Sequence, residues 1–291
     1  MELSTSEKLQ RAVDFLKSGP PGEIDDVFND IRVIIDDDKQ LQEEIGPILA
    51  ECNIQQFYAA EIEHPDSSES SKTVALLTEY NQLDSGSFID YDAGLSFDFD
   101  HLRLEVKNVS VCDTESGQDE FRDQLQAEAN KYKDEHFPGG HIKVFPNLGK
   151  SETSLEYVIC IINNKYNPDN YWNGRYQASW KFNPDTNELN GELSVRIHYY
   201  EDGNVQLAIS NSFHLEISPS ADYSSLPKSI FSLISKEEKQ FQLNVNKNYA
   251  HLNETTFKDL RRKLPLTKSK IDWLKIASYN LNDELSAVPQ I

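Results

Sequence analysis

Apolar residues recur at intervals of three and four through the first part of the chain, which is the spacing of one helix face. Three such stripes occur between residues 5 and 60, and Ser4 or Thr5 is placed to cap the first of them. The segment Ser18–Gly22 ends the first helix, and Asp36–Asp38 marks the turn before the third. Helices joined by such short links favour a small bundle over residues 5–60. The three stripes are Leu9, Val13 and Leu16; Val27, Ile31 and Ile34; and Leu41, Ile45 and Leu49.

The pattern changes to short apolar runs after the polar, serine-rich stretch at residues 64–72, which we interpret as a loop. These runs predict strands at residues 74–78, 87–90 and 95–98 and therefore a small β region over residues 61–115. A helical stripe follows at residues 118–136 and ends before Pro138. The stripe consists of Phe121, Leu125, Ala129 and Tyr132.

Alternating apolar and polar residues dominate the middle of the chain and predict strands of a half-buried sheet. Turn residues at Pro184–Asn187 and Glu201–Asn204 separate consecutive strands, which favours an antiparallel meander within residues 116–217. After Pro219 the pattern predicts one long helix over residues 220–254, which needs a large surface such as this sheet. The predicted strands are residues 157–163, 171–182, 192–200, 205–210 and 213–217.

Composition limits the class of protein. The chain has 291 residues, a formal net charge of −21 and 38% hydrophobic residues, which fits a folded, soluble protein that is repelled by nucleic acid. Its three cysteines form no CxxC pair, which argues against a disulfide framework or a zinc site. The longest apolar run, Val158–Ile162, is too short to cross a bilayer. We therefore expect a cytoplasmic protein.

A search for catalytic motifs gives no support for an enzyme. Glycine-rich phosphate loops, a GxSxG elbow and an HExxH pair are all missing from the sequence, and the seven histidines have no metal-ligand spacing. We interpret His198 as a structural residue and Asp36–Asp38 as a solvated helix cap rather than a cation site. The sequence thus predicts no catalytic residue, no metal and no cofactor.

One segment near the C-terminus reverses the charge of the chain. Residues 255–279 contain seven basic and two acidic side chains, a net charge of +5. Phe257, Leu260 and Leu264 form an apolar helical stripe beside the basic residues, and Pro265 ends it. Three interpretations remain open on these residues alone: a solvated helix face, a site for anionic membrane surfaces, or a site for an acidic protein surface. Nucleic acid is the weaker option because the rest of the chain repels it.

Eight motifs follow one another along the chain: Gly19–Glu23, Val27–Arg32, Leu77–Glu79, Phe88–Asp90, Phe99–Arg103, His198–Leu207, Phe257–Pro265 and Lys270–Trp273. Their sequences and order resemble the alpha subunits of F-actin capping protein, and the resemblance runs from about residue 10 to residue 281. It implies an α+β fold in which alpha and beta subunits pair about a pseudo-twofold axis as a heterodimer. Each subunit would have an N-terminal three-helix stalk, a small β region, an antiparallel β-sheet covered by a long C-terminal helix, and a basic extension over residues 255–291. The two sheets would join into one.

The resemblance also implies a function: calcium-independent binding to the barbed ends of actin filaments, which blocks subunit exchange there without nucleotide, metal or cofactor. Location would be the cytoplasm and the cytoskeleton, in actin-rich cortex or patches. Phosphoinositides and capping-protein regulators would compete at the same basic residues, and a phosphoinositide or membrane-surface adaptor is the alternative function. Lys268 stands where related animal proteins have arginine, so it keeps the charge but loses bidentate geometry. The implied actin-binding residues are Lys258, Arg262, Lys268, Leu260, Leu264 and Trp273.

Overall fold

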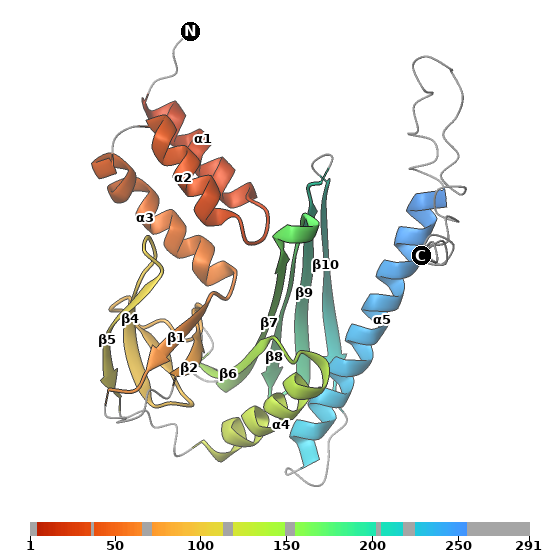
Figure 1. Ribbon diagram of the computed structural model, residues 1–291. Coiled ribbons are helices and arrows are strands. Elements are labelled where there is room, and N and C mark those ends of the chain that lie inside the picture. Colours follow the sequence, from red (N-terminus) through yellow and green to blue (C-terminus); the bar gives the residue numbers. More distant parts are fainter. Residues whose placement is uncertain are drawn as a thin grey trace, which may run out of the picture. The chain divides into compact units, whose positions relative to one another are not determined.

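A computed structural model describes residues 5–35, 38–65, 72–112, 119–148, 155–201, 205–217 and 225–254. The chain divides into two compact units, Met1–Leu233 and Ile234–Ile291. The first unit is an α+β structure that contains every described strand, as Figure 1 shows. None of the described helices is long and apolar enough to cross a membrane.

Helices α1 (Thr5–Ser18), α2 (Ile24–Ile35) and α3 (Asp38–Gln55) confirm the predicted N-terminal helices. Leu16, Ile31, Ile45 and Leu49 of the predicted stripes are buried in their shared core, but on α1 the residue buried with Leu16 is Ala12, and Val13 of the predicted stripe is half-buried. Helix α3 ends at Gln55, and its last turns bury Cys52 and Asn53. The core residues are Ala12, Leu16, Ile31, Ile45 and Leu49.

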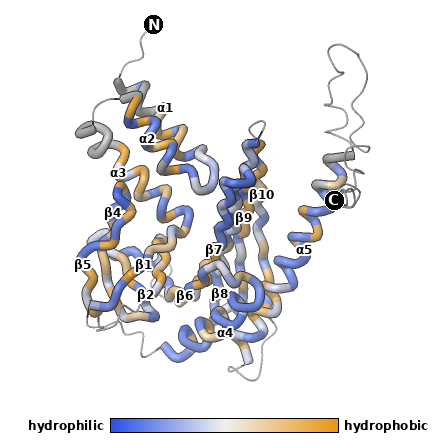
Figure 2. Tube along the Cα trace, viewed as in Figure 1, coloured by the Kyte–Doolittle hydropathy of each residue, from blue (hydrophilic) through white to orange (hydrophobic). Residues whose placement is uncertain are grey.

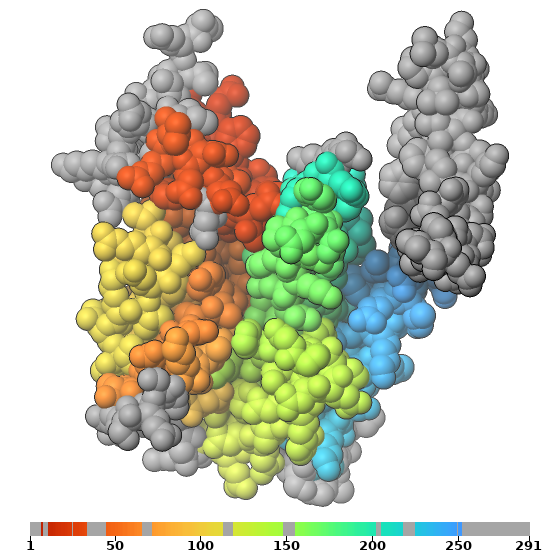
Figure 3. Space-filling view, viewed as in Figure 1, coloured from red at the N-terminus to blue at the C-terminus, as the bar shows by residue number. Residues whose placement is uncertain are grey.

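Two small sheets follow these helices. Strands β1 (Ala59–Glu63) and β2 (Lys72–Leu76) pair with each other, and β3 (Phe88–Asp90), β4 (Leu95–Asp100) and β5 (Glu105–Val111) form a three-stranded sheet. The pattern predicted β2, β3 and β4 but missed β1, which follows α3 closely, and β5, whose side chains are mostly polar. Figure 3 shows this region, in yellow and orange, below the N-terminal helices and beside the larger sheet, within the first unit.

The larger sheet is a five-stranded antiparallel meander in the order β10-β9-β8-β7-β6. Its strands are β6 (His141–Leu148), β7 (Leu155–Asn167), β8 (Trp172–Asn183), β9 (Glu188–Tyr199) and β10 (Val205–Glu216). The two strands predicted at 205–210 and 213–217 are one strand, because Asn211 and Ser212 keep the register with β9. Strand β6 was missed, because Pro146 and its flanking polar residues interrupt the alternation.

The two faces of this sheet differ. Helix α4 (Glu120–His136) lies on the first face, where the Phe121 ring is 5.0 Å from Tyr157 and 6.0 Å from Phe182. Figure 2 shows α4 as mostly hydrophilic, which agrees with a helix that buries only one stripe. On the same face, a Cβ at Gly191 would lie 2.3 Å from the Trp180 ring, so only glycine fits there.

The second face is apolar in the middle of β7 and at Phe145 of β6, and it is mostly polar on β8 to β10. Val158, Cys160 and Ile162 pack there with Phe57 and Leu76, which belong to the small-sheet region. This contact joins the larger sheet to the preceding elements within the first unit. The outer strands carry serine, asparagine, arginine and histidine on this face instead, with Ser179, Ser194 and Ser210 as examples.

Helix α5 (Leu226–Glu254) confirms the predicted long helix. Its first turns belong to the first unit, where Leu226, Ile230 and Phe231 are buried and the Phe231 ring is 5.4 Å from Tyr132 of α4. The described part of the second unit is the rest of this helix, residues 234–254, and Leu243 there is 53% exposed.

Candidate functional site

The six residues predicted to bind actin lie outside the described part of the chain, which ends with α5 at Glu254. They are Lys258, Arg262, Lys268, Leu260, Leu264 and Trp273. Their roles therefore remain predictions. The described residues nevertheless include three features of the larger sheet: two groups of polar contacts that join it to other elements, and an exposed edge.

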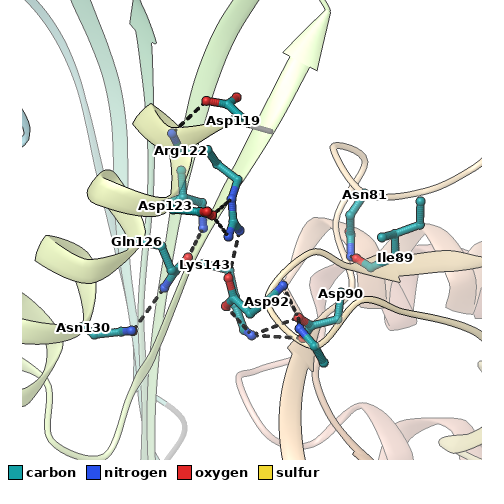
Figure 4. Close-up of polar contacts among 12 residues, drawn as sticks. Asn81, Ile89, Asp90, Asp92, Asp119, Arg122, Asp123, Gln126, Asn130 and Lys143 are labelled. Atoms are coloured by element: carbon teal, nitrogen blue, oxygen red, sulfur yellow. Dashed lines mark hydrogen bonds and ion pairs between the residues drawn. The ribbon is translucent and has the colours of Figure 1, made fainter. Parts of the chain in front are cut away.

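The first junction is a buried ion network between the small sheets, α4 and β6, drawn in Figure 4. The ammonium of Lys143 on β6 lies 2.9 Å from Asp90 Oδ2 and 2.8 Å from Asp92 Oδ2. The guanidinium of Arg122 on α4 lies 2.8 Å from Asp92 Oδ1 and 2.5 Å from Asp123 Oδ1. The Asp90 side chain is only 1% exposed, so this network holds its charge away from water.

The shifts in pKa show how completely these charges are compensated. Burial raises the pKa of Asp92, but Lys143 and Arg122 outweigh burial and leave it below its ordinary value. Burial likewise lowers the pKa of Lys143, and Asp90 and Asp92 outweigh it, so that its pKa is raised. Both partners are therefore held in their charged forms. Carboxylates held in this way are poor proton donors or acceptors at neutral pH, and the network is best explained as structural.

Two hydrogen-bonded side chains fix α4 to the sheet beside this network. Asp119 caps α4 by accepting from the Arg122 amide at 3.0 Å, and it also accepts from the Tyr157 hydroxyl at 3.1 Å. Gln126 accepts from the Val144 amide at 2.8 Å and donates to the Ile142 carbonyl at 3.2 Å, so it pairs with the free edge of β6. This edge of the sheet is thereby covered.

The second junction joins α2 to the opposite end of the sheet. Glu23, just before α2, lies 2.7 Å from His198 Nδ1 on β9 and accepts from Asn173 Nδ2 on β8 at 3.2 Å. The His198 ring is buried and stacks on Tyr200 at 5.0 Å. The structural role predicted for His198 is confirmed by these contacts. Among the described residues, no group of three or more His, Cys, Asp or Glu side chains is arranged to hold a metal ion.

The third feature is the sheet edge at β10, which has no neighbouring strand in the described part of the chain. The first face of the sheet carries apolar side chains beside this edge: Tyr199 is 41%, Ile197 38% and Val205 59% exposed. Register places Val205 opposite Tyr199 and Leu207 opposite Ile197, and Tyr199 is also opposite Trp172. We call these five residues the apolar edge patch: Trp172, Ile197, Tyr199, Val205 and Leu207.

The apolar edge patch shows how far a face of the sheet is covered. The alternation from Leu193 to Tyr199 places these side chains on one face. Leu193 is 1% exposed, but Tyr199 at the other end of the same stripe is not covered. Alternation along a strand identifies a face of the sheet, whereas the length of that face that is covered depends on the elements packed on it.

The family of the chain follows from comparisons with known proteins. The sequence model described as "F-actin capping protein alpha subunit" matches residues 12–284. The chain belongs to this F-actin capping protein alpha subunit family. A capping protein alpha subunit of Caenorhabditis elegans is 35% identical over 98% of this chain and 99% of its own length. One from Neurospora crassa is 32% identical over 93% and 94%.

A solved structure agrees with the fold of this capping protein family. It is described as a homodimeric actin capping protein alpha subunit from Plasmodium berghei, and it superposes with a TM-score of 0.71 at 18% identity. The match covers 91% of this chain and 99% of that one. Members of the capping protein alpha family are non-enzymatic actin-binding proteins that cap barbed ends, and they act in the cytoplasm at the cytoskeleton. The chain shares this function.

Proposed function

We propose that the chain caps barbed ends as one subunit of a heterodimer with a beta subunit, and that the basic segment after α5 makes its contact with actin. The single observation that carries the actin site is the reversal of charge: residues 255–279 have a net charge of +5 in a chain of −21. A concentrated basic segment beside an apolar stripe suits an acidic protein surface. Capping of this kind requires no calcium, nucleotide or cofactor.

The mechanism has two steps. Lys258, Arg262 and Lys268 attract the acidic filament end and raise the association rate. Leu260, Leu264 and Trp273 then bury apolar surface against actin and slow dissociation. Charged residues at the rim of an interface act mainly on association, whereas buried apolar anchors act mainly on release.

Pairing with the beta subunit is proposed to occur at β10. This edge strand is twelve residues long, and an exposed edge of this length is a template for another strand. The apolar edge patch lies directly beside it and offers the side-chain contacts that a stable interface needs. In the resulting dimer, the two sheets become continuous and the long helices α5 cover them. A related alpha subunit is described as homodimeric, so self-pairing through the same edge is the outcome to distinguish.

Tests of the actin site measure barbed-end elongation from actin seeds with the co-expressed heterodimer. Arg262→Ala should slow capping, and the difference from wild type should shrink as salt is added, because screening removes steering. Arg11→Ala is the matched control, since Arg11 is exposed on α1 and has the same charge. An Arg262→Ala heterodimer that caps at the wild-type rate in low salt would rule out the steering role.

The pairing proposal is tested separately. Val205→Glu should abolish co-purification with the beta subunit, because it buries a charge in the proposed interface. Leu83→Glu is the control, since Leu83 is 40% exposed in a loop of the small-sheet region. Light scattering on the chain alone reports self-pairing. If the Val205→Glu variant still co-purifies with the beta subunit, the interface does not include β10.

Finer assignments belong to the same proposal. The basic segment would also bind phosphoinositides and capping-protein regulators, and the protein would concentrate in actin-rich cortex or patches. We propose functional segments at residues 5–60, 61–115, 116–217, 220–254 and 255–291. The alternative function, a membrane-surface adaptor, requires that liposomes containing anionic lipid float the heterodimer without actin and that actin elongation is unaffected.

A further inference from the structure

Two arginines face each other on the polar face of the larger sheet. Arg175 on β8 is the direct register partner of Arg196 on β9. Directly opposed side chains in antiparallel strands have Cβ atoms about 4.5–5.5 Å apart, and like charges in that position repel. Arg175 is 9% exposed and Arg196 is exposed, so water screens the repulsion only from the side of Arg196.

The surroundings do not neutralise either charge. Arg175 donates from Nε to Asn164 Oδ1 at 3.2 Å and from Nη2 to the Tyr166 hydroxyl at 3.1 Å, and both acceptors are neutral. In the described ranges, no carboxylate forms an ion pair with Arg175 or Arg196. Glu23, which reaches this face, is bound by His198 and Asn173 instead. Glu192 is on the same face of β9 but lies four residues before Arg196.

The neighbouring positions on the face supply no acid either. Around Arg196 they are Ala208 on β10, with Ser194 and His198 on its own strand. A buried guanidinium without a counter-charge is costly, and a second guanidinium beside it adds to that cost. Residues that lower the stability of a fold are often kept because a function, such as ligand binding, needs them.

Space for a ligand is present beside Arg175. A pocket of about 280 Å³ is lined by this arginine together with side chains that offer hydrogen bonds, namely Asn53, Gln56, Tyr58, Asn164 and Tyr166. The wall at Tyr166 is fixed by Gly22, which has φ +81° and at which a Cβ would lie 2.8 Å from the tyrosine ring. The pocket is therefore formed before any ligand binds.

We propose that Arg175 and Arg196 form an oxyanion site that binds a carboxylate group. Asn164 and Tyr166 occupy Nε and Nη2 of Arg175, so its Nη1 is the donor left for a carboxylate oxygen. The exposed guanidinium of Arg196, opposite it in the register, supplies the second charged donor, and the amide side chain of Gln56 in the pocket wall adds a neutral one. A doubly charged phosphate fits less well, because Glu23 and Asp26 line the adjacent pocket, which shares Gly22 and Tyr166. The carboxylate comes either from an acidic side chain of another protein or from a small free acid. The residues of this site are different from those of the basic segment and of the apolar edge patch.

The test uses the co-expressed heterodimer and isothermal titration with three probes: glutarate, a blocked tripeptide with a central glutamate, and inorganic phosphate. Both carboxylates should bind saturably, and Arg196→Gln should weaken that binding about tenfold or more, which is the effect of losing one charge-assisted hydrogen bond. Arg196→Lys should restore part of the affinity. Tighter binding of the tripeptide identifies a protein source, and tighter binding of glutarate identifies a small acid.

Arg103→Gln is the matched control, since Arg103 is exposed in the turn before β5 and the variant has the same change of charge. It should leave the titration unchanged. A structural role for Arg196 predicts instead that Arg196→Gln lowers the melting temperature of the ligand-free protein. The proposal is overturned if neither carboxylate binds at millimolar concentration, if Arg103→Gln weakens binding equally, or if phosphate binds more tightly than both carboxylates.

Discussion

Lys143 and Arg175 lie on the same face of the same sheet, but Lys143 contacts carboxylates and Arg175 does not. The Lys143 side chain is 13% exposed and contacts two carboxylates, Asp90 and Asp92. Arg175 is 9% exposed and contacts only neutral acceptors, with Arg196 opposite it. The ion pairs of Lys143 hold β6 to the small-sheet region. Arg175 has no counter-charge, and its buried positive charge is therefore available to an anionic ligand. Four substitutions test this difference.

The largest effect is expected at the neutralised charge. Lys143→Met removes the cation that compensates the buried Asp90 and should lower the free energy of unfolding by roughly 3–5 kcal/mol. Urea unfolding followed by circular dichroism measures this change. Lys107→Met is the control: Lys107 pairs with Asp100 at 2.6 Å but its side chain is 44% exposed, so a loss of about 1 kcal/mol or less is expected. If Lys143→Met and Lys107→Met lower the free energy of unfolding equally, the buried ion pair is no more important for stability than the exposed one.

Asp92→Asn should lower the free energy of unfolding by roughly 1–3 kcal/mol, because Asp92 accepts from both Lys143 and Arg122. The pKa of Asp92 is below its ordinary value of 3.8 in the folded protein. Its contribution is therefore complete above that value and is lost as the pH falls through the folded pKa. Urea unfolding from pH 7 to pH 3 should show a smaller loss on acidification in Asp92→Asn. An acid dependence identical to wild type would contradict this assignment.

Glu23→Gln changes the second junction without changing its shape. The bonds to His198 and Asn173 lose their ionic acceptor, and the expected loss is roughly 0.5–1.5 kcal/mol. Chemical denaturation of the heterodimer measures it, with Glu105→Gln on exposed β5 as the control. A loss as large as that of Lys143→Met would mean that Glu23 also compensates the arginines on this face.

Arg196→Gln should have the smallest effect on stability. Removing one of two opposed like charges on the sheet should leave the free energy of unfolding within about 0.5 kcal/mol of wild type or raise it slightly. The measurement is thermal unfolding without added carboxylate. Destabilisation by more than about 1 kcal/mol would show that Arg196 stabilises the fold. The arginine pair would then be structural, as the Lys143 network is.

Much of the fold was predictable because its elements have strong periodic patterns. The stripe Phe121, Leu125, Ala129 and Tyr132 is buried on α4 as predicted, and the helices of the N-terminal region lie within a few residues of their expected positions. Strands β1, β5 and β6 were missed. Each takes its strand conformation from pairing with a partner, as β6 does with β7, rather than from its own alternation.

Of the candidate sites, one could be found from the sequence and the others only from the structure. The basic segment was found from sequence because a cluster of like charges is visible without a fold. The pairs Asp90–Lys143 and Glu23–His198 join residues 53 and 175 positions apart, so no local pattern indicates them. The opposition of Arg175 and Arg196 depends on the register of β8 with β9, and a shift of one residue would place the two side chains on different faces.

The sequence alone determined the order of helices and strands, the meander, the long helix and the position of the basic segment, because these depend on local periodicity and composition. Its ordered motifs also indicated the capping protein alpha family. Only the tertiary structure decided which charges are compensated, how far the apolar face of the sheet is covered at Tyr199, and that β10 has no further strand beside it among the described residues. These properties depend on contacts between residues distant in sequence, and the free energy of a buried charge or an exposed side chain is set by those contacts.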